Sequence, residues 1–132
     1  MSKSWTDKRP MSPHLSAWKW HPTMLSSILN RATGIVLYFA ILKLCVGLAF
    51  LATGPEAFAK VSGILYSPIG AFSFFLSMGI ILYHLLNGLR HLAWDAGKGF
   101  DPKFSNILSI VIIAASAIGA VALTYCLVGS LK

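Results

Sequence analysis

Two histidines in this 132-residue chain occupy one helical stripe near the end of a long apolar run. The run from Pro68 to Leu82 contains no ionisable side chain, and His84 follows after a single tyrosine. An ionisable residue inside a membrane-spanning helix is costly and is by default a functional-site hypothesis. His91 lies seven residues further on, so the two imidazoles share a helical face and are roughly 10 Å apart along the axis.

Three roles are open to His84: a hydrogen bond between helices, a proton relay, or ligation of a metal. Gly88 lies one turn further along the same stripe, and its missing side chain leaves a groove in which a flat ligand can approach the backbone. Arg90 and His91 add cationic groups at the membrane edge. This combination suits a buried porphyrin whose iron is held by His84.

Geometry limits how such an iron can be held. Two axial ligands approach from opposite faces, so their nitrogens are only about 4 Å apart. His84 and His91 are too far apart on one rigid helix to meet that condition. The other two histidines, His14 and His21, lie outside the predicted membrane spans. If the iron has two histidine ligands, the second must come from another chain.

A second polar pair lies near the start of the first apolar segment. Ser27 and Arg31 are four residues apart and therefore share a helical face, which we expect at the depth of Arg90 and His91. A hydroxyl and a guanidinium together can hydrogen-bond a polarised carbonyl or hold a carboxylate. The alternative is an interfacial arginine that only follows the charge rule of membrane proteins, with Ser27 as a residue near the helix start.

The elements that must position these residues are long apolar helices. Hydrophobic residues make up 56% of the chain and charged residues only 11%, whereas soluble domains carry about 25% charged residues. We predict an all-α integral membrane protein that forms a single domain over 1–132. It has an N-terminal arm at 1–22 and three transmembrane helices. These spans cover about 23–52, 68–94 and 107–128. The stretch 53–67 is expected to be a loop, with a short amphipathic turn as an option.

The net charge of +7 predicts the orientation in the membrane. Three spans place the arm and the loop after the second span on one side, and this side carries Lys3, Lys8, Arg9, Lys19, Arg31, Arg90, Lys98 and Lys103. The other side carries only Lys60 and Lys132. The N-terminus is therefore predicted to be cytoplasmic, in a multi-pass protein of the bacterial inner (plasma) membrane. The alternative is the mitochondrial inner membrane, with the N-terminus in the matrix. No nucleic-acid motif accompanies the charge.

Three motifs in order resemble a known family. RPMSPHL (Arg9–Leu15), SILNRATG (Ser27–Gly34) and HLLNGLRHLAWD (His84–Asp95) are similar to the cytochrome b556 membrane-anchor subunits of succinate dehydrogenase. The predicted three-span topology agrees with that family, whereas the third span resembles the family only in its hydrophobicity. The resemblance implies a subunit of succinate:quinone oxidoreductase, respiratory complex II. Such a subunit shares a haem b with a second small membrane-anchor subunit. Together they bind an iron–sulfur subunit, which holds the flavoprotein subunit that oxidises succinate.

The resemblance also implies roles for individual residues. His84 matches the axial ligand of the haem iron, and Ser27 and Arg31 match positions that line the ubiquinone site. Arg31 and His91 lie on the propionate side of the haem, and Asp95 is a candidate proton relay at the same membrane edge. The chain contains no flavin or dicarboxylate site, so we expect no catalytic activity from it alone, only from the assembled oxidoreductase.

One residue departs from the family pattern. The family usually has a histidine directly before the arginine of the second motif, where this chain has Asn30 before Arg31. Asn30 can donate a hydrogen bond but carries no charge, so propionate binding is expected to be weaker or to shift to Arg31 and His91.

Two other functions remain compatible with the sequence. The first is the anchor subunit of a quinol:fumarate reductase, which has the same architecture and works in the reverse direction. The second is a haem-free membrane scaffold or transporter subunit, in which His84 only pairs with a neighbouring helix. A visible absorption spectrum of the purified complex separates the haem proteins from the haem-free class.

Overall fold

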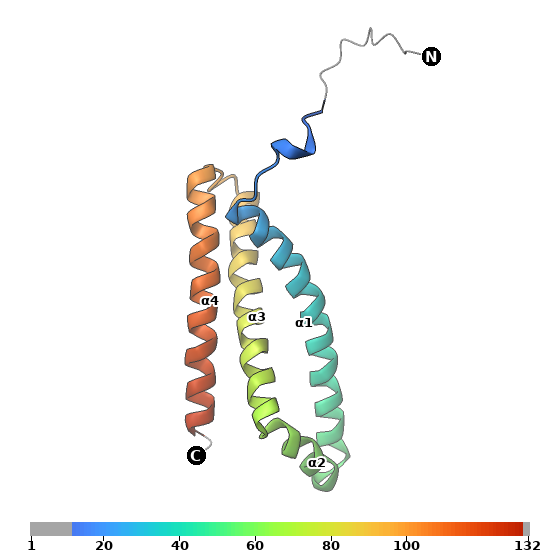
Figure 1. Cartoon of the computed structure of the whole chain (residues 1–132). Helices are drawn as coiled ribbons and strands as arrows, with labels where there is room; N and C mark the ends of the chain where they lie inside the picture. Colours follow the sequence, from blue (N-terminus) through green and yellow to red (C-terminus); the bar gives the residue numbers. More distant parts are fainter. Residues whose placement is uncertain (1–11, 131–132) are drawn as a thin grey trace, which may run out of the picture.

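Three long α-helices, one short α-helix and one 3-10 helix build the protein, in a computed structural model that describes residues 12–130 (Figure 1). A short 3-10 helix at Leu15–Ala17 is followed by α1 (Pro22–Thr53), α2 (Pro55–Leu65), α3 (Pro68–Asp95) and α4 (Pro102–Ser130). The described part contains no strand, and α1, α3 and α4 are each long and apolar enough to cross a membrane. The predicted all-α membrane fold with three spans is confirmed. Of the predicted arm, residues 1–11 lie outside the described part.

Proline marks the start of every helix from α1 to α4. Pro22, Pro55, Pro68 and Pro102 each occupy the first helical position, where the missing N–H group costs no hydrogen bond. We expected Pro102 to lie in a loop before a span at 107–128. Instead it opens α4, and the Asp101 carboxylate accepts a hydrogen bond from the backbone N–H of Phe104 at 2.8 Å. The third long helix therefore begins five residues earlier than predicted.

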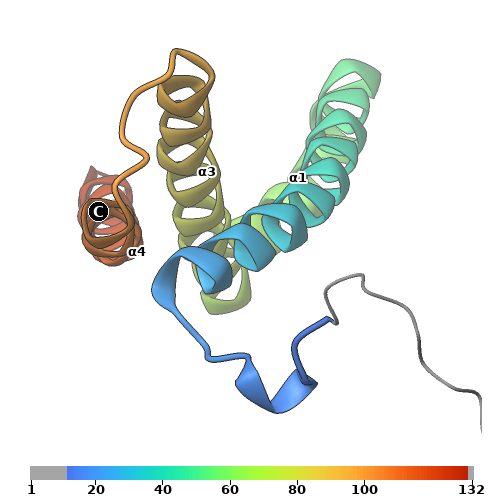
Figure 2. The same cartoon turned by 90° about the horizontal axis from the view of Figure 1, so that it is seen from above.

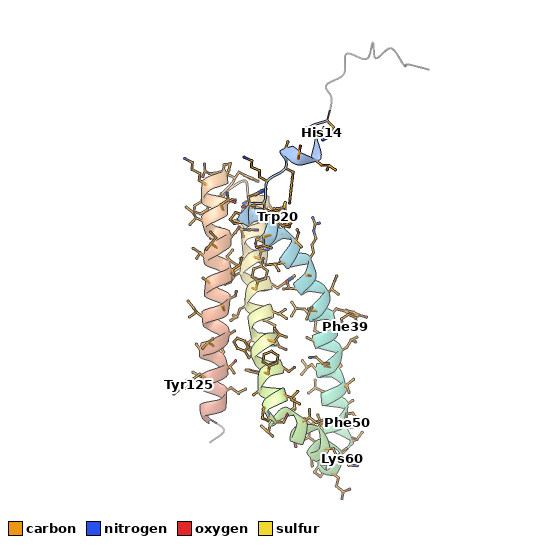
Figure 3. The ribbon with its side chains drawn as sticks, viewed as in Figure 1. His14, Trp20, Phe39, Phe50, Lys60 and Tyr125 are labelled. Carbon is orange, nitrogen blue, oxygen red and sulfur yellow. The ribbon has the colours of Figure 1, made fainter. Side chains whose placement is uncertain are left out.

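The stretch 53–67, expected as a loop, is mostly helical. It contains the eleven-residue helix α2, which links the far ends of α1 and α3. Gly54 makes the turn from α1 into α2 with a φ of 127°, a conformation that side-chain-bearing residues rarely adopt. Figure 3 shows Lys60 of α2 and Phe50 at the end of the bundle opposite His14 and Trp20. Helix α2 therefore lies at the second membrane edge, opposite the N-terminal arm.

Helices α3 and α4 run side by side along their length (Figures 1 and 2). The buried stripe of α4 repeats every three or four residues and consists mainly of small side chains: Ser105, Ser109, Ile112, Ser116 and Ala120. A Cβ atom added at Gly79 of α3 would lie 3.5 Å from the Cβ of Ala120. Small residues at such a seam let membrane helices approach closely.

Helix α1 contacts the other two long helices near its start and then diverges from α3 (Figure 1). Near the start, the backbone N–H and the hydroxyl of Thr23 both donate to the side-chain oxygen of Asn106 on α4, at 3.3 and 2.8 Å. Ser26 is the one buried residue of α1, whereas Phe39 and Phe50 further along are exposed. The three helices therefore converge at the end of the bundle that carries the arm.

Candidate functional site

His84 belongs to α3, and its side chain contacts two consecutive residues of α1, Thr33 and Gly34. Its Nδ1 is 3.2 Å from the hydroxyl oxygen of Thr33. A Cβ atom added at Gly34 would lie 3.3 Å from the ring carbon Cε1, so the imidazole packs directly against the α1 backbone. The side chain is half-buried. The contacts with Thr33 and Gly34 position the ring against the neighbouring helix.

Gly88 and His91 continue the stripe toward the membrane edge. A Cβ atom added at Gly88 would meet no other atom within 4 Å, so the surface of α3 beside this glycine is open. His91 is half-buried and makes an edge-to-face contact with Trp94, with ring centroids 5.0 Å apart. Asp95, the last residue of α3, is exposed at the same edge. The predicted stripe is therefore present, with open helix surface between its two histidines.

The register of α1 against α3 places Ser27 and Arg31 deeper than expected. Ser26 and Thr33 both contact α3, at Asn87 and His84, and the two site residues lie between these contacts. Their backbone is therefore roughly one to two helical turns deeper than the edge of α3 at which we expected them. The Arg31 side chain is exposed, the Ser27 side chain is half-buried, and neither makes a polar contact among the described residues.

The other two histidines lie at the arm end of the protein. His14 directly precedes the short 3-10 helix, and His21 directly precedes α1. Both side chains are exposed. Neither of the two contacts His84 among the interactions of the described residues.

A second polar stripe on α3, which the sequence analysis missed, is buried. Tyr83 and Asn87 face Ser26 of α1, and all three are buried. The Tyr83 hydroxyl donates to the backbone carbonyl of Ser26 at 2.7 Å, and the Ser26 hydroxyl donates to the side-chain oxygen of Asn87 at 3.0 Å. This network fixes α1 against α3 one turn from His84.

Arg90 continues the buried stripe and is only 3% exposed. It donates to the hydroxyl of Ser109 on α4, which in turn donates to the backbone carbonyl of Ser105 at 2.8 Å. The guanidinium carbon lies 4.5 Å from the ring centroid of Trp94, within the range of a cation–π contact. Two of its nitrogens, Nε and Nη2, are buried and have no hydrogen-bond partner. We expected this arginine to mark the membrane edge, and it is instead enclosed by the helices.

The spacing of the second stripe could have revealed it. Tyr83, Asn87 and Arg90 are separated by four and three residues, so they share one face of α3, adjacent to that of His84. Polar side chains at that spacing inside an apolar run indicate a face directed at other helices rather than at lipid. The sequence does not specify Ser26 and Ser109 as partners, since this depends on the packing of α1 and α4.

A cavity of about 300 Å³ opens at the same end of the bundle, between the start of α1 and the connection from α3 to α4. Its walls are partly aromatic and partly polar, and consist of His21, Thr23, Trp94, Phe100, Pro102, Ser105 and Asn106. Ser27 and Arg31 are not among its lining residues.

Comparison with known proteins gives a consistent result. Residues 6–123 match the family described as "Succinate dehydrogenase/Fumarate reductase transmembrane subunit". A succinate dehydrogenase cytochrome b556 subunit of Paracoccus denitrificans is 37% identical over 113 residues, which cover 86% of this chain and 87% of the relative. The corresponding subunit of Rickettsia prowazekii (strain Madrid E) is 34% identical over 110 residues, 83% of this chain and 86% of the relative.

A mitochondrial relative extends the comparison beyond bacteria. The succinate dehydrogenase cytochrome b560 subunit of Mus musculus is 32% identical over 124 residues, which cover 91% of this chain and 73% of the relative. The three long apolar helices agree with a transmembrane subunit. The chain therefore belongs to the family of succinate dehydrogenase and fumarate reductase transmembrane subunits.

Proposed function

We propose that this chain is a membrane-anchor subunit of succinate dehydrogenase that holds haem b through His84 and contributes Ser27 and Arg31 to a ubiquinone site. The observation that carries the proposal is the placement of His84, whose imidazole is held between two membrane-spanning helices beside an open stretch of α3 surface. The cytochrome b names of the relatives support the haem assignment.

The residues around His84 fit a flat metal-bearing group. Thr33 occupies the Nδ1 side of the ring, and the second ring nitrogen, Nε2, makes no polar contact with any described residue. Gly88, one turn further along, leaves space beside the helix that a larger side chain would fill. Arg31 and His91 supply cationic or hydrogen-bonding groups for propionates, and Asn30 offers its amide in place of the histidine that is usual in the family.

When bound, haem b supplies a one-electron carrier inside the membrane. This chain would hold the group through one histidine, His84, because its other histidines lie on the same helix or at the arm. We infer that a second small anchor subunit would supply any further histidine ligand. The diverging half of α1, with its exposed Phe39 and Phe50, leaves apolar surface for that subunit and for lipid.

The haem assignment is tested with His84→Leu in the assembled complex. We expect the reduced b-type absorption band to be lost or strongly shifted while the helices still insert, because leucine cannot ligate iron. His14→Leu is the matched control, since it removes an exposed histidine far from His84 and should leave the spectrum intact. A normal reduced spectrum in the His84 variant would show that the ligand lies elsewhere.

The quinone assignment rests on two properties of Ser27 and Arg31: both can donate hydrogen bonds, and neither donates one to another described residue. Both side chains reach the surface and have no polar partner among residues 12–130, so both can donate to a quinone oxygen. A guanidinium beside such an oxygen stabilises the negative charge that develops on it during reduction. His91 and Asp95 lie between this region and the aqueous edge, where they can deliver protons.

Substitution of the arginine tests this site. Loss of a hydrogen bond from a charged group costs about 1.5–3 kcal/mol, so Arg31→Leu should lower succinate-to-quinone turnover by roughly one to two decades. Succinate oxidation with an artificial acceptor at the soluble subunits should persist. Lys43→Leu removes an exposed cation from the same helix and serves as the matched control. A wild-type rate of quinone reduction in the intact Arg31 variant would mean that Arg31 serves only as a charge that orients the protein in the membrane.

The relatives and the charge distribution support a proposal for the direction and location of the reaction. The three relatives described above are all named as succinate dehydrogenase subunits, which favours succinate oxidation over fumarate reduction. The arm end of the bundle carries most of the cations, and Lys60 lies at the other end. We therefore place the arm, and the docked iron–sulfur and flavoprotein subunits, on the cytoplasmic side of a bacterial inner membrane. The mitochondrial matrix is the equivalent side.

A further inference from the structure

The hydroxyl of Thr33 makes three polar contacts at once. Its oxygen lies 2.8 Å from the backbone carbonyl of Leu29, 2.9 Å from that of Asn30 and 3.2 Å from Nδ1 of His84. A hydroxyl has one proton to donate and two lone pairs to accept with. The two shorter contacts go to carbonyl oxygens, which can only accept, so we assign the hydroxyl proton to the α1 backbone and a lone pair of the hydroxyl to the longer contact with His84.

The protonation of the His84 ring follows from this assignment. A neutral imidazole has one N–H group and one unprotonated nitrogen, and the hydrogen bond at one nitrogen determines which is which. An oxygen that accepts at Nδ1 requires the proton to be on Nδ1. The unprotonated nitrogen is then Nε2, and its lone pair is free to ligate a metal.

Gly34 fixes the same ring from the adjacent position. The ring carbon Cε1, which lies between the two nitrogens, would be 3.3 Å from a Cβ atom at this residue. That distance is closer than an ordinary van der Waals contact, so glycine permits the imidazole to approach the α1 backbone and reach the Thr33 hydroxyl. The two consecutive residues therefore form a clamp, Thr33–Gly34, that sets both the tautomer and the position of the ring.

We infer that Thr33 is a positioning residue for the haem ligand: it accepts the Nδ1–H bond of His84 and so presents Nε2 to the iron. This inference rests on the proposed haem function. An acceptor at Nδ1 also makes the imidazole a stronger electron donor, which favours oxidised iron and lowers the midpoint potential of the haem. Helix α1, which supplies no ligand of its own, would thus tune the haem through one hydroxyl.

The experiment replaces the hydroxyl in the assembled complex. Thr33→Val keeps the branched shape and removes the acceptor, and Thr33→Ser keeps the acceptor. Loss of a partner beyond the metal ligand typically weakens metal binding 10- to 100-fold. For this single neutral bond we expect roughly 10-fold weaker haem retention, a higher midpoint potential and shifted low-spin electron paramagnetic resonance signals. Thr33→Ser should restore all three.

A second threonine provides the matched control. Thr124 of α4 donates to the backbone carbonyl of Ala120 at 2.7 Å, the same kind of bond that Thr33 makes, and has no contact with an imidazole. Thr124→Val should leave the potential and the resonance signals unchanged. If Thr33→Val does not assemble, Thr33→Ala removes the same hydroxyl without adding an atom and is measured instead.

The results separate this inference from the haem proposal. Loss of haem in His84→Leu, together with a wild-type potential and spectrum in Thr33→Val, would overturn the role of Thr33 and leave the ligand assignment standing. Retention of the haem spectrum in His84→Leu would overturn both. A change in Thr33→Val that Thr33→Ser fails to reverse would also contradict the inference, since it would reflect packing at this position rather than the hydrogen bond.

Discussion

The two interfaces of α3 differ in kind. Toward α4, the helix packs along its length against a seam of small residues that ends in Gly79 and Ala120. Toward α1, contact is concentrated at one end and is made largely by polar groups, of which Ser26 and Thr33 are the centre. The first interface is a continuous helix pair, and the second is a short polar junction from which α1 diverges.

This difference indicates how a small chain can be both a stable unit and part of a larger site. Close packing of small residues stabilises α3 against α4. The polar junction holds the start of α1 in register, so that Thr33 meets His84, and leaves most of the rest of α1 exposed. The proposed function would use this open surface beside His84 for a second subunit.

The largest loss of stability is expected from a substitution that overpacks the α3–α4 seam. Ala120 is 1% exposed, and Ala120→Leu would push three additional carbon atoms against α3 at Gly79. Overpacking costs typically 1–3 kcal/mol, and we expect a loss of stability of about 3 kcal/mol. The measurement is the thermal midpoint of the purified complex in detergent. Ala117→Leu on the exposed face of α4 should change it little; equal effects would mean that the seam is not closely packed.

A smaller loss of stability is expected where Ser109 of the seam bonds to the buried Arg90. Ser109→Ala removes the hydrogen-bond partner of Arg90 and leaves the whole guanidinium buried without an acceptor. Bonds to charged groups contribute about 1.5–3 kcal/mol, and we expect a loss of about 2 kcal/mol. Ser116 is also buried, but bonds only to its own helix, so Ser116→Ala should be nearly neutral in the same thermal unfolding experiment.

The smallest effect is expected at the α1 junction. Hydrogen bonds between membrane helices average about 0.6 kcal/mol and reach about 1.7 kcal/mol. Ser26→Ala, which removes the bond to Asn87, should therefore cost about 1 kcal/mol. The adjacent Ser27 has no polar partner within the described part of the chain, so Ser27→Ala should leave thermal stability unchanged while it lowers quinone turnover. If Ser27→Ala destabilised the complex as much as Ser26→Ala, the two serines would not have separate structural and functional roles.

Local features of the sequence determined the architecture of this protein. Hydropathy and length were enough to place three spans, because each span must satisfy its own backbone hydrogen bonds inside lipid. Helical periodicity was enough to place His84, Gly88 and His91 on one stripe, because that spacing holds on any helix. The motifs around His84 and Arg31 were enough to indicate the family that the comparisons confirmed.

Only the tertiary structure decided which faces are buried and which residues meet. Arg90 looked like an edge charge in the sequence, and packing between α3 and α4 encloses it. Thr33 had no predicted role of its own in the second motif, and the register of α1 brings it to His84. The stretch 53–67 looked like a loop, yet most of it forms α2. The physical reason is common to all three: side-chain type and spacing fix a helix and its stripes, whereas burial and pairing depend on neighbours that are distant in the chain.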